Sequence, residues 1–183
     1  SDFTDVRANG KIAMKMDKDD HLVRVRVFEE QDNVFLATRK GKCIRFPVTD
    51  VRVFSGRTST GVRGISLTKG DEVIAMSGLK HVKAEVTVRD DYLRSVNAGR
   101  RLSGGDYTDR EEDESRDKEL MARLKESQFV QMADAEEYIL TVAADGMGKR
   151  TSAYDYRISK RGGKGIDSID LKRKKKNLTT VVA

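Results

Sequence analysis

Residues 34–52, VFLATRKGKCIRFPVTDVR, decide the fold of this 183-residue chain, because residues 139–157, ILTVAADGMGKRTSAYDYR, repeat them. The offset is 105 residues, and it pairs Gly41 with Gly146, Arg45 with Arg150, Asp50 with Asp155 and Arg52 with Arg157. Each copy holds two short β-rich runs around a glycine. Glycine readily supplies the positive φ that a hairpin turn needs. We therefore expect two equivalent β-hairpins.

A shorter offset relates two other stretches. GKIAMKMDKDDHLVRV (10–25) and GVRGISLTKGDEVIAM (61–76) match at 51 residues, and a third copy opens at Gly162. Self-similarity at a fixed spacing of this size indicates a repeat architecture. The chain therefore contains a unit of about 51 residues, and one unit carries an insertion.

Each unit is predicted to consist of short strands. HLVRVRVF (21–28) alternates valine and arginine with the two-residue period of a half-buried strand, and we expect further strands at 33–39 and 137–143 and a turn at 68–71. About four strands in about 50 residues is the size of a propeller blade. The alternative is a β-sandwich with coincidental internal similarity.

The insertion, residues 80–135, differs in kind. Residues 80–137 carry eleven basic and fifteen acidic residues, whereas the whole chain has a net charge of +6. We expect a loop over 97–106, where Gly99, Gly104 and Gly105 lie, and helix or disorder from Asp109 onward. A tolerated loop excursion is the preferred interpretation; a regulatory or partner-binding role is the alternative.

Familiar catalytic motifs are not matched. Gly146–Thr151 resembles a phosphate-binding loop, but Arg150 stands where Ser or Thr must follow Lys149. His21 and His81 lack further ligands at metal-binding spacing, so we expect no metal site. The lone Cys43 excludes an internal disulfide, is expected to be a half-buried strand residue, and fits a reducing cytosol. No apolar run approaches the length of a transmembrane helix.

Basic residues recur at repeat-equivalent positions, in the hairpins and in the connections between units. On a propeller-like disc they would place positive charge around the rim, where it can neutralise phosphates without reading bases. Glycines in GVRG and RGGKG could offer N–H groups to phosphate oxygens. The run KRKKK (172–176) could add to the same field. The predicted DNA-binding residues are Lys42, Arg45, Arg52, Arg57, Arg63, Lys149, Arg150, Arg157, Arg161 and Lys164.

At these motifs the chain resembles the C-terminal domain of the DNA gyrase A protein, and the paralogous topoisomerase IV domain less closely. GVRGI-x-L-x-x-GD and DG-x-GKRT carry the resemblance, which covers 1–79 and 136–183. It implies an all-β fold, a β-pinwheel whose blades exchange strands with their neighbours. Residues 1–183 would form a partial disc of about two and a half blades, part of a longer protein.

The resemblance also implies a function. The domain would wrap double-stranded DNA around its basic rim, so that ATP-driven strand passage introduces negative supercoils. It would act with the gyrase B protein and a second gyrase A protein in the bacterial cytoplasm, associated with the nucleoid. It would hold no catalytic residue and no cofactor, because ATP and Mg²⁺ serve the type II topoisomerase elsewhere. A propeller scaffold for protein partners is the alternative from another class.

One departure from the family concerns its heptapeptide box, Gln-Arg/Lys-Arg-Gly-Gly-Arg/Lys-Gly. Residues 160–165 match its last six positions, but Ser159 replaces the glutamine, and the stretch lies in a later unit. We therefore interpret it as a repeat-equivalent loop without the special role of the box.

Overall fold

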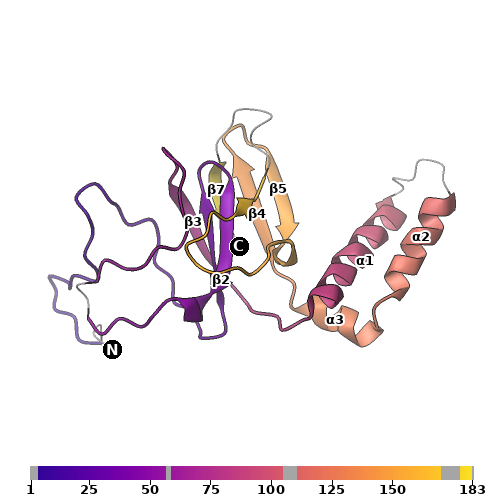
Figure 1. Cartoon of the computed structure of the whole chain (residues 1–183), viewed down its shortest axis with the longest axis horizontal. Coiled ribbons are helices and arrows are strands. Elements are labelled where there is room, and N and C mark those ends of the chain that lie inside the picture. The colour runs from indigo at the N-terminus through magenta and orange to yellow at the C-terminus, as the bar shows by residue number, and fades with distance from the viewer. Residues whose placement is uncertain (1–3, 57–58, 105–110, 170–177, 183) are drawn as a thin grey trace.

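The computed structural model describes residues 4–56, 59–104, 111–169 and 178–182 and consists of two small sheets and a helical arm (Figure 1). The first sheet has the order β3-β1-β2-β6, and the second β5-β4-β7. The strands and 3₁₀ turns are β1 Asn33–Thr38, β2 Lys42–Pro47, η1 Val48–Asp50, β3 Val73–Leu79, β4 Tyr138–Ala143, β5 Gly148–Ser152, η2 Ala153–Asp155, β6 Ile166–Asp167 and β7 Leu178–Val182. The helices are α1 Val86–Gly104, α2 Glu111–Ala122 and α3 Glu126–Asp134.

The two hairpins have identical registers at the offset of 105 residues. Asn33 pairs with Pro47 in the first hairpin, and Tyr138 pairs with Ser152 in the second. Gly41 and Gly146 both have a φ of 83° in their turns, as predicted. Each hairpin runs directly into a 3₁₀ turn, η1 or η2. The sequence repeat is therefore a structural repeat, and we call the two sheets the first and second blade.

A third strand joins each hairpin in the same way. β3 pairs antiparallel with β1, and β7 pairs antiparallel with β4. Both pairings contain a bulge at the equivalent point, between Ala37 and Thr38 and between Val142 and Ala143. The predicted strands at 33–39 and 137–143 and the turn before β3 are confirmed, since Gly70 has a φ of 69° there.

β6 shows the exchange of strands between blades. It follows the second hairpin in the chain, but it pairs with β2 of the first blade. The GGKGI stretch, expected to open a third unit, therefore lies at the edge of the first. Segments that match in sequence here also touch: the Gly162 N–H donates to the Gly64 carbonyl at 2.7 Å.

The main core lies between the blades. Phe35, Ala37 and Cys43 of the first blade are buried against Ile139 and Tyr156 of the second. The rings of Phe35 and Tyr156 meet edge to face, with centroids 5.0 Å apart. Such apolar burial is the main stabilising contribution to a small β-structure, so the blades are held together by one shared core.

The strand predicted at 21–28 is wrong. These residues carry no strand pairing in the structure, and Val25 and Val27 are 76% and 92% exposed. An alternating pattern forms a strand only where a partner strand and a core face exist. Within the described residues this segment has neither.

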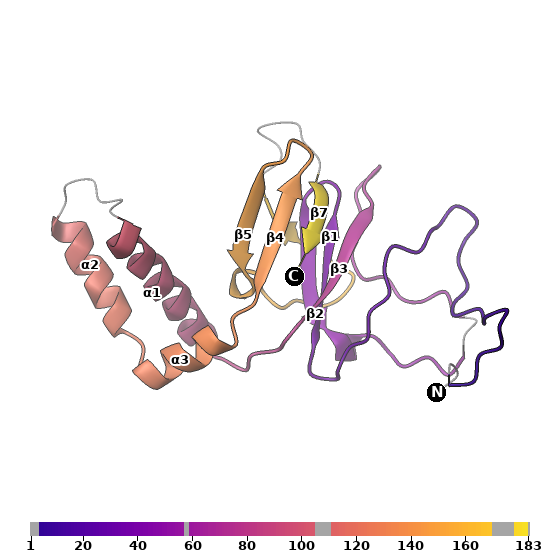
Figure 2. The ribbon, with the colours of Figure 1, turned by 180° about the vertical axis from the view of Figure 1, so that it is seen from behind.

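The helical arm, residues 86–134, departs from the expected loop at 97–106 as far as Gly104. α1 continues through Gly99 because Ser95 and Ala98 are buried in the arm and the Ser95 hydroxyl donates to the Leu120 carbonyl of α2 at 2.8 Å. An ion pair from Arg101 to the buried Asp117 adds to this packing. Residues from Glu111 onward are helical, in agreement with their composition. Figure 2 shows the arm projecting from one side of the blades.

Candidate nucleic-acid interface

The seam loop, residues 157–165, runs along the outer edge of β2 and connects the two blades. Ile158 forms a parallel bridge with Arg45, and the Ser159 N–H donates to the Arg45 carbonyl at 2.8 Å. The Ser66 N–H donates to the Gly163 carbonyl at 2.8 Å on the other side. Backbone hydrogen bonds thus hold the loop on two sides, which gives its side chains defined positions.

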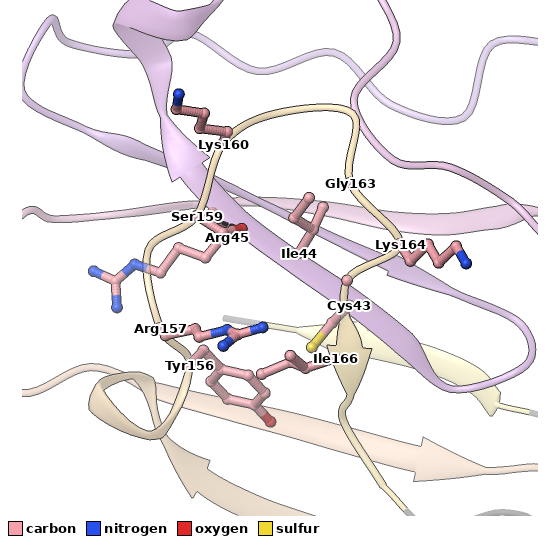
Figure 3. A pocket seen from close by; sticks show the side chains of 11 residues that line it. Cys43, Ile44, Arg45, Tyr156, Arg157, Ser159, Lys160, Gly163, Lys164 and Ile166 are labelled. Carbon is pink, nitrogen blue, oxygen red and sulfur yellow. Dashed lines mark hydrogen bonds between the residues drawn. The ribbon is translucent and has the colours of Figure 1, made fainter.

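A groove of about 220 Å³ lies between the seam loop and β2. Its walls include Arg157, Lys160 and Lys164, all exposed, and Cys43 and Ile166 lie beside them. Figure 3 shows Lys160 and Lys164 extending from the loop on opposite sides of the groove. Three cations on one short loop create a local positive potential that attracts an anionic polymer.

Arg161 fixes the loop rather than facing solvent freely. Its Nε donates to the Asp50 carbonyl at 3.1 Å, and its Nη1 donates to the Arg63 carbonyl at 2.6 Å. The side chain of Arg63 is itself exposed. The structure therefore brings four of the predicted residues together here, namely Arg63, Arg157, Arg161 and Lys164.

Arg45 requires a revision, because its side chain is only 5% exposed. Its Nη1 donates to the Ala153 carbonyl at 2.7 Å, and its Nη2 donates to the Lys80 carbonyl at 3.1 Å. Burial lowers the pKa of the guanidinium, and the Glu137 carboxylate opposes that effect. A buried cation with these partners joins the blades and the arm and is not accessible to a DNA phosphate in this structure.

The remaining predicted residues lie elsewhere. Lys42 forms an ion pair with Asp167 at 2.8 Å, which partly neutralises it. Arg52 is exposed and stacks on the Phe54 ring at 4.8 Å. Lys149 and Arg150 are exposed on β5, where Arg150 lies 4.2 Å from the centre of the Tyr138 ring. Arg57 and the run 172–176 lie outside the described residues.

The glycines of the seam loop serve packing between strands. The Gly162 N–H is already bonded to Gly64, so it does not wait for a phosphate oxygen as predicted. Gly165 has a φ of 69°, and a Cβ there would overlap the Cys43 carbonyl oxygen and lie 3.0 Å from its carbon. Only glycine allows β6 to approach β2 so closely.

Lys160 is a cation of the groove that was not among the predicted residues. The repeat could not identify it, because the equivalent position in the first unit holds Ser55. Its neighbour Arg161 likewise has a glycine, Gly56, at the equivalent position. The contiguity of KRGGKG was the available signal, and the exposure of each side chain was not.

Other chemistry finds little support at this groove. Burial raises the pKa of the Cys43 thiol to about 12, so it is a poor nucleophile at neutral pH. No group of three or more His, Cys, Asp or Glu among residues 4–169 and 178–182, apart from the stretches left undescribed, could hold a metal ion. In the same part of the chain, no helix has the length and apolar character to span a membrane. The arrangement supports electrostatic binding of an anion.

Comparison with known proteins gives a consistent family. The family described as "DNA gyrase C-terminal domain, beta-propeller" matches residues 1–29, 32–78 and 137–174. The DNA gyrase A protein of Granulibacter bethesdensis is 48% identical over 178 residues, covering 93% of this chain and 19% of that protein. The gyrase A protein of Rickettsia bellii is 44% identical over 173 residues, covering 94% and 18%. The chain therefore spans about a fifth of the length of these relatives.

Two solved structures share the fold. The C-terminal domain of DNA topoisomerase IV matches with a TM-score of 0.61 at 16% identity, over 98% of this chain and 40% of that chain. The DNA gyrase A C-terminal domain matches with a TM-score of 0.56 at 18% identity, over 96% and 41%. Both likenesses support the blade architecture.

Proposed function

This chain belongs to the DNA gyrase C-terminal domain family, and we propose that it is a non-catalytic module that binds duplex DNA and wraps it around a basic rim. The observation that carries the proposal is the seam loop. Arg161 and backbone hydrogen bonds hold it in place, and it presents Arg157, Lys160 and Lys164 to solvent. Arg63, Arg52, Lys149 and Arg150 would continue the contact on other edges.

The chemistry of these side chains suits the phosphate backbone. Lysine and arginine neutralise phosphates and release condensed counterions, whatever the base sequence. Contacts of this kind position a protein on DNA, and the cost of bending the duplex is offset by further contacts along the curved surface. We expect weak sequence preference.

In the proposed enzyme, the wrap presents a neighbouring DNA segment for strand passage, and this yields negative supercoils. DNA cleavage, ATP hydrolysis and Mg²⁺ belong to other parts of the assembly, with the gyrase B protein and a second gyrase A protein as partners. The same proposal places the protein at the bacterial nucleoid. The names of the relatives support this assignment.

A salt titration tests DNA binding. The logarithm of the association constant for duplex DNA should fall linearly with the logarithm of the salt concentration. Each lost phosphate contact reduces the slope by about 0.9, so Arg157→Glu with Lys164→Glu should reduce it by about 2. The matched control is Lys18→Glu with Lys125→Glu, since both lysines are exposed and neither lines the groove.

Equal slopes for the two double variants would contradict the assignment of the seam loop. Absence of DNA binding by the unaltered chain at low salt would contradict the module itself. That second result would favour a scaffold that binds proteins.

A further inference from the structure

A second groove lies where the helical arm joins the second blade, and we call it the arm groove. Its volume is about 350 Å³. One wall is the stem of the arm, which includes Val82 and Lys83, and the other is the chain around Tyr154 and Ile158. The two walls come from segments about 70 residues apart in the sequence.

The charge of this groove is positive. Its basic lining residues are Arg45, Lys83, Arg89 and Arg157, and none of the residues that line it is Asp or Glu. Lys83 and Arg157 are exposed, whereas Arg89 is paired with the Asp90 carboxylate at 2.9 Å. The buried Arg45 contributes a further feature, because its Nε has no hydrogen-bond partner among the described residues. This electrostatic environment favours an anion.

The arm is fixed to the blade, so its stem has a defined position. The Tyr154 hydroxyl of η2 donates to the Met132 carbonyl of α3 at 3.0 Å, within the buried cluster that also holds Tyr92. The Tyr92 and Tyr154 rings meet edge to face at 5.6 Å, and the Tyr92 hydroxyl donates to Glu136 at 2.8 Å. Lys83 is therefore held near the blade and does not move with a free loop.

Arg157 lines both grooves, which makes the arm groove continuous with the seam loop. The acidic α2 lies on the side of the arm away from the blades (Figures 1 and 2). The arm, although acidic in total, thus presents basic residues at its junction with the blade.

We propose that the arm groove binds the phosphate backbone of the same DNA duplex, so that the stem of the arm extends the DNA-binding rim through Lys83. This inference rests on the proposed function. It assigns a DNA contact to the insertion, which the repeat pattern could not suggest because Lys83 has no repeat-equivalent partner.

Site-specific photocrosslinking tests contact rather than long-range attraction. The chain contains one cysteine, and Cys43 is fully buried, so Lys83→Cys and the control Lys125→Cys can each be labelled with a photoactivatable group. Lys125 is an exposed lysine of the same insertion outside the groove. We expect several-fold more crosslinked duplex from Lys83→Cys. Equal yields would overturn the proposal.

Salt titration separates this inference from the proposed function. Lys83→Glu should lower the salt slope by about 1, and Lys125→Glu should leave it unchanged. If the Arg157→Glu with Lys164→Glu variant lowers the slope but Lys83→Glu does not, the arm groove is not a DNA contact while the DNA-binding module stands. If neither variant changes the slope, the proposed function fails as well. Circular dichroism of each variant confirms that the fold is retained.

Discussion

Arg45 and Arg150 occupy equivalent positions in the two hairpins, opposite Phe35 and Leu140, yet Arg45 is buried between the blades and Arg150 is exposed over the Tyr138 ring. The difference follows from their neighbours. The seam loop and β6 cover the outer edge of β2, whereas β5 is the edge strand of its sheet within the described residues. One repeated residue therefore joins blades in one unit and faces solvent in the other.

Arg45→Leu should destabilise the chain far more than Arg150→Leu. The first change leaves the Ala153 and Lys80 carbonyls without a charged donor, which costs about 3 kcal/mol. The second removes an exposed cation–π contact worth about 0.5–1 kcal/mol. Urea unfolding followed by circular dichroism measures both free energies. Similar losses in the two variants would contradict the structural role of Arg45.

Gly165→Ala should weaken the seam between β6 and β2. The added methyl group would overlap the Cys43 carbonyl, and the positive φ of 69° disfavours alanine, so we expect a loss of at least about 2 kcal/mol in the free energy of unfolding. Gly163→Ala is the matched control, because a Cβ there makes only ordinary contacts at 3.7 Å. Urea titrations of both variants should differ clearly, and a neutral Gly165→Ala would refute the close approach.

The Cys43 thiol should resist Ellman's reagent at pH 8 until the protein unfolds. Burial raises its pKa from 9.0 to about 12, and the thiolate is the reactive form. The same shift predicts that the unfolded chain releases this proton first. The contribution of Cys43 to stability is therefore present below about pH 9 and is lost as the pH rises towards 12. Rapid labelling of the folded chain at pH 8 would disprove the burial.

Nicked circular DNA ligated in the presence of the complete protein should trap positive writhe if this chain belongs to a gyrase that wraps DNA. The topoisomers are resolved on agarose gels after the protein is removed. The seam-loop variant Arg157→Glu with Lys164→Glu should trap less writhe, because fewer phosphate contacts offset the cost of bending. Circles without trapped writhe would favour the topoisomerase IV type of domain.

The repeat was predictable because it depends on local chemistry. Glycines at 41 and 146 and the short apolar runs around them specify a hairpin with little help from the rest of the chain. The strand predicted at 21–28 failed for the opposite reason, since a half-buried strand needs a partner edge that no local pattern supplies. The helix through Gly99 was missed because packing on α2 outweighs the low helix propensity of glycine.

The amino-acid sequence alone determined the repeat, the two hairpins with their turns, and the set of basic residues that suits a phosphate backbone. Only the tertiary structure decided which of those cations face solvent. Arg157 and Lys164 are exposed on a loop, Arg161 fixes that loop, and Arg45 is buried, although all four have the same charge in the sequence. The reason is physical: a side chain binds DNA or backbone carbonyls according to which neighbours the exchange of strands between blades places beside it.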